Sequence, residues 1–176
     1  MTMMTIENVL VLVHAKCMDG LGAAWAASRW LVEPEFIACS YGGDVPDTAG
    51  RDVMIFDFSF PRDTLIEMHQ KAKRLVLIDH HKTAETELIG LDFAVLDMTK
   101  SGAVLAWEYL ASRFSQPGQI TTLPTILAYI QDRDLWRWEM ESSREYSEAL
   151  RSEIDFESGT VLDHVKKMDT IYQSYG

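Results

Sequence analysis

Residues 75 to 81 read Leu-Val-Leu-Ile-Asp-His-His, a short apolar run that ends on an acid and two imidazoles. Four consecutive apolar residues between polar neighbours predict a strand buried on both faces of a parallel sheet. In open α/β sheets, ligands collect at the carboxyl ends of the strands. We therefore expect Asp79, His80 and His81 at a functional edge, although two adjacent histidines on a loop are also common at ordinary surfaces.

Two further apolar runs end in the same way. Residues 9–14 read Val-Leu-Val-Leu-Val-His and are soon followed by Cys17 and Asp19, while residues 52–57 read Asp-Val-Met-Ile-Phe-Asp. Polar residues that follow strands are usually a mixture of Gly, Asn, Ser, Thr and Lys. Three runs that each stop on a possible metal ligand therefore favour a metal site over an ordinary loop region.

The alternation of strand-like and helix-like segments predicts an α/β fold. We expect a doubly wound, mainly parallel five-stranded sheet with helices on both faces. The expected strands are residues 9–14, 36–40, 53–57, 75–78 and 93–97, and the expected helices are residues 19–31, 61–72 and 103–114, the last capped by Ser101. After the Pro-Gly pair at 117–118 the pattern becomes helical. Residues 1–176 are thus expected to form one domain, with an α/β core over 1–115 and a helical extension over 120–176.

Composition and length are those of a globular domain. The 176 residues are 47% hydrophobic and 24% charged, which is ordinary for such proteins. No apolar run approaches the roughly 18 residues of a membrane span, and the N-terminus lacks a signal-like core. We expect a cytoplasmic protein without a membrane partner, in which Cys17 and Cys39 are reduced.

The formal net charge of −11 restricts the partners of the chain. It argues against binding of long duplex nucleic acid through a basic surface of the protein itself. It does not exclude a phosphate substrate, because two divalent ions would add about four positive charges where the phosphate binds.

The candidate ligands combine carboxylates with imidazoles. They are His14, Asp19, Asp57, His80, His81 and Asp132. The multi-cysteine pattern of structural zinc is absent from the sequence, and mixed oxygen and nitrogen ligands suit manganese or a similar divalent ion. Asp57 lies centrally in the set and is the natural bridge between two metals. The chemistry that this set indicates is attack of metal-activated hydroxide on a phosphate.

These residues resemble the motifs of the DHH phosphoesterase superfamily, which includes RecJ-type exonucleases, family II inorganic pyrophosphatases, oligoribonucleases and cyclic-nucleotide phosphodiesterases. The resemblance covers residues 9 to about 138, and the motif sequences are most similar to those of the oligoribonuclease B-like branch. The matching motifs are His14-Ala-Lys-Cys-Met-Asp-Gly20, Phe56-Asp-Phe58, Asp79-His-His81 and Gln131-Asp-Arg-Asp-Leu-Trp136.

The resemblance implies a role for each motif residue. His14, Asp19, Asp57, His80 and Asp132 would bind two manganese ions, with Asp57 bridging. The same match gives His81 a catalytic contact with the substrate phosphate and makes Asp79 the residue that orients its neighbours. Lys82, Ser101 and Arg133 are further candidates for phosphate contacts, with a surface role as the alternative for each. For Asp134, a structural pairing competes with a role in the site.

Two departures from the family pattern bear on function. Many relatives have an aspartate where this chain has Cys17, and a thiolate is a poor match for manganese. Cys17 could instead be a small buried residue. Relatives also usually carry a C-terminal substrate-binding domain with a glycine-rich motif, and nothing in this sequence matches it. The site could therefore be completed by a separate substrate-binding domain or by a homo-oligomer.

The sequence thus supports one main functional hypothesis and two alternatives. The main hypothesis is a manganese-dependent phosphohydrolase that cleaves a phosphodiester or phosphoanhydride of a small nucleotide or short single-stranded oligonucleotide. The first alternative is a non-catalytic module that keeps the fold and binds a nucleotide or a partner. The second is the catalytic part of a split enzyme.

Overall fold

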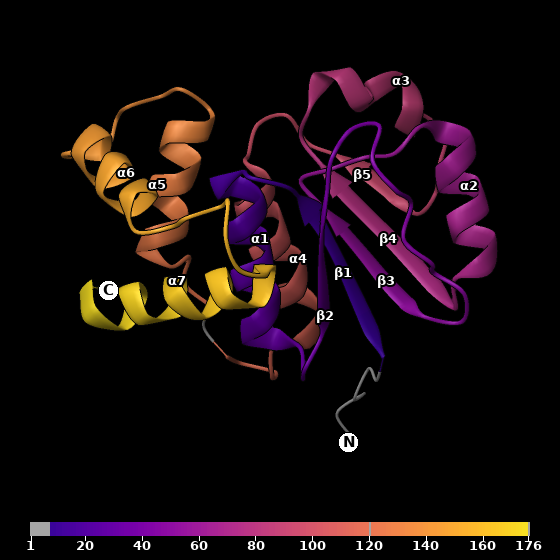
Figure 1. Ribbon diagram of the computed structural model, residues 1–176, viewed down its shortest axis with the longest axis horizontal. Helices are drawn as coiled ribbons and strands as arrows, with labels where there is room; N and C mark the ends of the chain where they lie inside the picture. Colours follow the sequence, from indigo (N-terminus) through magenta and orange to yellow (C-terminus); the bar gives the residue numbers. More distant parts are fainter. Residues whose placement is uncertain (1–7, 120, 176) are drawn as a thin grey trace.

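The computed structural model describes residues 8–119 and 121–175 and contains a five-stranded sheet (Figure 1). Its strands are β1 (Val9–His14), β2 (Glu35–Cys39), β3 (Asp52–Phe56), β4 (Arg74–Asp79) and β5 (Ala94–Leu96). They lie in the order β2-β1-β3-β4-β5, and every neighbouring pair is parallel. The predicted parallel α/β sheet is therefore confirmed.

Helices cover both faces of the sheet. Those described are α1 (Met18–Trp30), α2 (Arg62–Lys71), the short α3 (Glu85–Leu88), α4 (Gly102–Phe114), α5 (Thr125–Asp134), α6 (Ser143–Ser152) and α7 (Val161–Tyr175). The core on one face contains α1 and α4, and the core on the other contains α2 and α3. The elements expected through residue 114 appear with each end shifted by at most one residue. The 3-10 turn η1 (Lys82–Ala84) and α3 were not expected.

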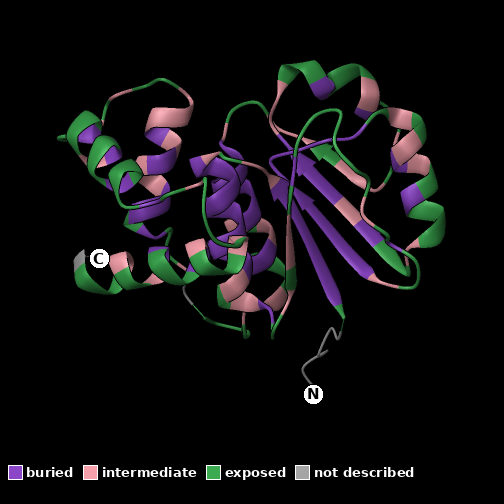
Figure 2. Ribbon diagram, in the orientation of Figure 1, coloured by how far each residue is buried: buried purple, intermediate pink, exposed green. Residues whose placement is uncertain are grey.

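The central strands are buried on both faces. In β1, Val11 and Val13 pack in the core beside α1, whereas Leu10 and Leu12 pack in the core beside α2. Successive side chains of a strand point to opposite faces, so a continuous apolar run serves two cores at once. Figure 2 shows the central strands β1 and β3 almost entirely buried, whereas the edge strands β2 and β5 and the outer surfaces of the helices carry exposed residues.

Helix α4 begins as its sequence predicts. The hydroxyl of Ser101 accepts a hydrogen bond from the backbone N–H of Val104 at 3.5 Å. The cap satisfies one of the unpaired donors at the helix N-terminus. It also fixes where α4 starts, which is beside the carboxyl ends of the strands.

The C-terminal helices pack outside α1 and α4. Tyr172 of α7 lies edge-on to Trp25 of α1, with 5.0 Å between ring centroids. Asp169 accepts hydrogen bonds from the indole N–H of Trp25 at 3.3 Å and from Arg29 at 2.8 Å. These contacts attach α7 to α1. Across the described ranges, no helix combines the length and apolar character needed to cross a membrane.

Helices α1 and α4 approach each other closely at Gly22. A Cβ atom at Gly22 would lie 2.8 Å from Ala103 Cβ and 3.2 Å from Ile130 Cδ1. Side chains of ordinary size would hold the two helices apart. The small residues therefore bring the N-termini of α1 and α4 together at one end of the sheet.

We expect Gly22→Ala to destabilise the protein. Helix propensity alone favours alanine over glycine by about 1 kcal/mol. Overpacking against Ala103 costs roughly 1 to 3 kcal/mol and should outweigh this gain, so the free energy of unfolding should fall by up to about 2 kcal/mol. Urea unfolding of the two proteins measures the difference. A more stable variant would contradict the close contact between α1 and α4.

Candidate metal centre

The strand order has a topological switch point between β1 and β3. From β1 the chain passes through α1 to β2 on one side, and from β3 it passes through α2 to β4 on the other. Such a reversal of direction is where ligands bind in open α/β sheets, outside the carboxyl ends of the strands. His14 ends β1 and Asp57 directly follows β3, so both lie at this switch point.

Asp57 is fully buried at the centre of the site. Its backbone has a φ of 58°, in the left-handed region that residues other than glycine seldom adopt. A Cβ atom at Gly102 would lie 2.8 Å from Asp57 Oδ1 and 2.9 Å from its Cα. Glycine at position 102 is therefore what allows the first turn of α4 to approach Asp57. Strained backbone of this kind is concentrated at functional sites.

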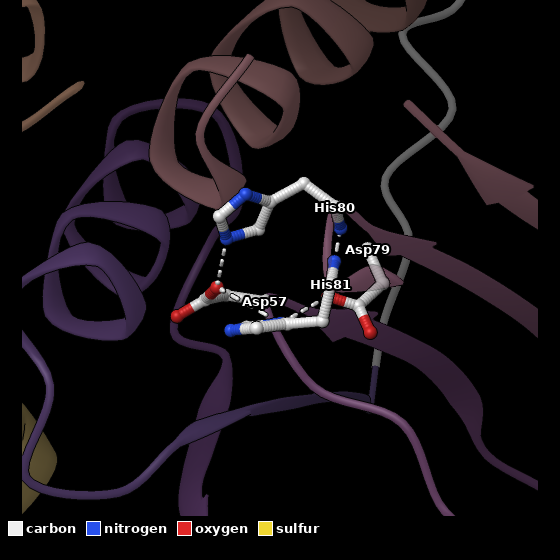
Figure 3. Close-up of side chains that lie close together, drawn as sticks. All are labelled: Asp57, Asp79, His80 and His81. Atoms are coloured by element: carbon white, nitrogen blue, oxygen red, sulfur yellow. Dashed lines mark hydrogen bonds and ion pairs between the residues drawn. The ribbon is translucent and has the colours of Figure 1, made fainter. Parts of the chain in front are cut away.

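Three carboxylates surround the imidazole of His80. Its Nε2 atom lies 3.1 Å from Asp57 Oδ1, 3.4 Å from Asp19 Oδ2 and 3.5 Å from Asp134 Oδ2. Figure 3 shows the ring pointing toward Asp57. The acids come from α1, from the end of β3 and from the end of α5, which are far apart in the sequence. The fold thus brings carboxylates from distant parts of the sequence to one imidazole ring.

Asp79 holds the two histidines that follow it. Its Oδ1 atom accepts hydrogen bonds from the backbone N–H groups of His80 and His81, at 2.8 and 3.3 Å, and from Nδ1 of His81 at 2.7 Å (Figure 3). This arrangement fixes the orientation of the His81 ring, which is 32% exposed and open to a ligand. The Oδ2 atom of Asp79 is buried without a hydrogen-bond partner among the described residues.

His14 and Cys17 lie on the other side of Asp57. His14 Nδ1 is 3.9 Å from Asp57 Oδ2, and Cys17 Sγ is 3.6 Å from the same oxygen. Burial and the nearby Asp57 raise the pKa of the Cys17 thiol, which donates a hydrogen bond to that carboxylate. Burial and His81 lower the pKa of His14, so its imidazole is neutral, as metal binding requires. Cys17 and Cys39 are free thiols.

The clustered acids make the centre electrostatically unfavourable without a cation. Burial, followed by the charges of Asp19, Asp134 and Asp79, raises the pKa of Asp57 well above its usual range. Burial and the charge of Asp19 raise the pKa of Asp134 to about 6. A bound divalent cation would lower these carboxylate pKa values again, because it is the largest local charge in a site.

Asp19 also holds the helix that covers the centre. Its two carboxylate oxygens accept hydrogen bonds from the backbone N–H groups of Gly102 at 2.6 Å and Ala103 at 3.0 Å. These donors belong to the first turn of α4, where the helix dipole favours negative charge. Asp19 is therefore part of the candidate centre and of the packing between α1 and α4.

Asp132, a predicted metal ligand, is not brought to this cluster. It accepts hydrogen bonds from the backbone N–H groups of Glu139 and Met140, at 3.0 and 3.3 Å, and from the hydroxyl of Ser143. Although burial raises the pKa of Asp132, these bonds outweigh it and keep the pKa below its usual range. Residues of a helix turn by about 100° each, so Asp134 points nearly opposite to Asp132. Asp134 is the acid that faces His80.

The predicted phosphate contacts occupy three different environments. Lys82 is exposed in η1, next to His81. Ser101 is fully buried and its hydroxyl caps α4. Arg133 is half-buried, and its positive charge partly offsets the rise in the pKa of Asp134. The close approach of Gly102 to Asp57 was not predicted, and its one signal in the sequence is the position of Gly102 directly after the Ser101 cap.

The donor groups fit a divalent cation. Within each of three groups, ligand atoms lie within 4.8 Å of one another: Asp57, Asp79, His80 and His81; His14, Cys17 and Asp57; and Asp19, His80 and Asp134. Asp57 and His80 each belong to two of the groups. The partnerless atoms His14 Nδ1 and Asp79 Oδ2, buried in the described part of the chain, are further donors for an ion. These residues could bind metal ions.

The fold and the site together define a parallel α/β protein with a candidate metal centre at the switch point of its sheet. No protein-family model matches the chain. It is 30% identical over 156 residues to the uncharacterized protein R106 of Acanthamoeba polyphaga mimivirus, a match that covers 78% of this chain and 35% of that protein.

A solved structure shares the fold. The chain is similar to an uncharacterized protein from Helicobacter pylori G27, with a TM-score of 0.73 and 15% sequence identity. The match covers 94% of this chain and 56% of that one. The chain therefore spans about a third of the length of the viral protein and little more than half of the bacterial one.

Substitutions at Asp132 and Asp134 should have opposite effects. We expect Asp132→Ala to lower the free energy of unfolding by roughly 1 to 3 kcal/mol, because it leaves the buried hydroxyl of Ser143 and two backbone N–H groups unpaired. Its Mn²⁺ affinity should change little. Asp134→Asn should lower Mn²⁺ affinity at least tenfold without this loss of stability. Titration calorimetry and urea unfolding measure both quantities, and a reversed pattern would assign Asp132 to the centre.

The stability of the metal-free protein should depend on pH through Asp134. Because its pKa is raised to about 6, the folded protein keeps a proton that the unfolded chain loses near pH 4. Relative to Asp134→Asn, the wild-type protein therefore loses stability as pH rises from about 4 to 6, by roughly 1 to 3 kcal/mol. Chemical unfolding of both proteins at pH values below and above this window measures the change. A difference that is constant with pH would contradict the raised pKa.

Proposed function

We propose that this chain is the catalytic part of a metal-dependent phosphohydrolase of the DHH phosphoesterase type. Its substrate would be a phosphodiester or phosphoanhydride of a small nucleotide or a short single-stranded oligonucleotide. The observation that carries the proposal is the buried carboxylate of Asp57, which faces possible ligands on two sides at the switch point of the sheet.

The two oxygens of Asp57 support a bridging role. Oδ1 faces Nε2 of His80, whereas Oδ2 faces His14 and Cys17. A carboxylate with separate partners at each oxygen can be shared by two cations. In the proposal, His14, Asp57, Asp19, His80 and Asp134 hold two divalent ions. Their mixture of carboxylates and imidazoles suits Mn²⁺.

In the proposed reaction, the divalent ions and the side chains of the protein have separate roles. Divalent ions, when bound, polarise phosphoryl oxygens and lower the pKa of water. The chain orients the donors, excludes bulk water and places His81 at the open side of the centre. With its Nδ1 held by Asp79, the His81 ring presents Nε2 to the phosphate. Water adds to phosphorus, the ester or anhydride P–O bond breaks, and the departing oxygen takes up a proton.

The acidic surface favours a small substrate. With a net charge of −11, the chain lacks the overall positive charge by which proteins hold long nucleic acids. A short or mononucleotide substrate needs only the cations of the centre and a few side chains. The remaining length of the related proteins, a second copy of the chain or a separate domain would supply further substrate contacts.

A second candidate function is a non-catalytic nucleotide-binding module. The observation in its favour is the neutral thiol of Cys17, which donates a hydrogen bond to Asp57 at the place where a metal-binding oxygen would serve manganese better. Such a module would keep the fold and one cation without turnover.

We expect turnover of at least one substrate from a defined panel. Metal-stripped protein is restored with Mn²⁺ and incubated with a 5′-phosphorylated dinucleotide, a cyclic nucleotide, adenosine bisphosphate and pyrophosphate, and the products are separated by chromatography. Asp57→Asn should reduce the rate on the order of a hundredfold or more, because it removes the charge shared by the cations.

Asp97→Asn provides the control for this substitution, because Asp97 is an acid outside the cluster whose carboxylate accepts hydrogen bonds from Thr99. Equal rates for Asp57→Asn and wild-type protein would contradict the proposal. Tight nucleotide binding with no turnover of any compound would support the non-catalytic module.

A further inference from the structure

A cavity of about 370 Å³ opens beside the candidate metal centre. Its inner end is lined by His14 and Cys17, which also face Asp57. Its sides are formed by β2 and by the loop that joins α6 to α7, residues 153–160, together with the start of α7. The cavity and the centre therefore share a wall.

The lining of the cavity suits a flat, mainly apolar group. Phe36 on β2 and Phe156 on the loop contribute aromatic rings, and Val13, Leu21 and Val161 contribute aliphatic surface. Thr160 and His164 add polar atoms at the far side. Ligand pockets typically have volumes of about 300 to 1,000 Å³, apolar walls and a few polar groups that orient the ligand. A single nucleobase with its sugar is of this size and character.

The wall formed by residues 153–160 and the start of α7 is held in place by its own hydrogen bonds. Asp155 accepts hydrogen bonds from the backbone N–H of Glu157 at 3.0 Å and from the hydroxyl of Ser158 at 2.7 Å. Nε2 of His164 lies 2.9 Å from the carbonyl oxygen of Asp155 and 2.8 Å from that of Ser158. The ring of Phe156 lies edge-on to His164, with centroids 5.4 Å apart. These contacts hold Phe156 in place, which lowers the entropy lost when a ligand stacks on it.

One residue of the cavity lining takes part in an exposed ion pair. Lys16, in the turn after β1, pairs with Glu157 of the loop at 2.8 Å, and both side chains are largely exposed. Exposed ion pairs of this kind contribute little to stability. Lys16 is thus a positively charged residue of the cavity lining.

We infer that this cavity binds the nucleobase of the substrate while the phosphate lies at the candidate metal centre. The inference rests on the proposed function and narrows its substrate class. Nucleotides gain stacking and apolar contacts in the cavity, whereas pyrophosphate and other base-free phosphates leave it empty. Base–aromatic stacking contributes about 1 to 3 kcal/mol per base, so the base selects nucleotides over inorganic substrates.

Binding of a nucleoside tests the cavity without any phosphate chemistry. Adenosine is titrated into metal-free protein, and amide signals are followed by NMR. We expect shifts confined to residues 13–21, 34–39 and 155–164, which contain the lining of the cavity. Ala38→Trp should weaken adenosine binding at least tenfold, because Ala38 is exposed and lines the cavity, so the indole fills it. Val32→Trp is the matched control, since Val32 is 72% exposed and does not line the cavity.

Kinetics with Mn²⁺ separate the inference from the proposed function. Ala38→Trp should raise KM for a dinucleotide at least tenfold, with kcat/KM for an abasic analogue changed less than twofold. Equal loss with both substrates, or adenosine shifts that lie elsewhere or are insensitive to Ala38→Trp, would overturn the base-binding assignment. Adenosine binding that follows the expected pattern without turnover of any phosphate would support the cavity and count against the proposed enzyme.

Discussion

The carboxylate of Asp19 joins the framework of the protein to its candidate centre. One side chain accepts hydrogen bonds from the first two residues of α4 and lies 3.4 Å from the imidazole of His80. Its orientation is therefore set by the helix dipole and two backbone donors before any cation binds. The rest of the arrangement depends on this link, because α4 can reach Asp19 only where Gly22 and Gly102 permit close approach.

The same arrangement is costly for stability. Asp57 is buried with a left-handed backbone, and Asp19, Asp79 and Asp134 lie close enough to raise its pKa. Folding without cations must therefore bring like charges together in a medium that solvates them poorly. Proteins keep such features where function requires them, and the large two-sided core of the sheet supplies the compensating stability. The candidate centre thus lowers the stability of the metal-free protein through the same acids that could bind a metal ion.

The sequence predicted the sheet well because its central strands are buried on both faces. Continuous runs such as residues 9–14 are short, apolar and β-branched, so their ends are sharp and their polar terminal residues meet at one edge. That geometry also explains why His14, Asp57 and Asp79 could be placed together from the sequence. The sequence could not show whether Asp132 or Asp134 faces His80, because that depends on the rotation of α5 relative to the sheet.

Other features depend on contacts between distant segments. The burial of Ser101 and the approach of Gly102 follow from the packing of α4 on α1, which leaves no local pattern. The short η1 and α3 have too few residues for a recognisable periodicity. The cavity forms where β2 meets the loop before α7, more than a hundred residues later in the chain. Only the folded arrangement brings these two walls together.

The wall that the cavity shares with the candidate centre has a thermodynamic consequence. His14 and Cys17 face both spaces, so a cation that fixes His14 also changes the surface that a ligand in the cavity meets. Two binding events that depend on one side chain are linked, and linkage is reciprocal. The factor by which a cation alters affinity in the cavity equals the factor by which an occupant of the cavity alters affinity for the cation. Measuring either affinity with and without the other ligand would therefore give the same coupling free energy.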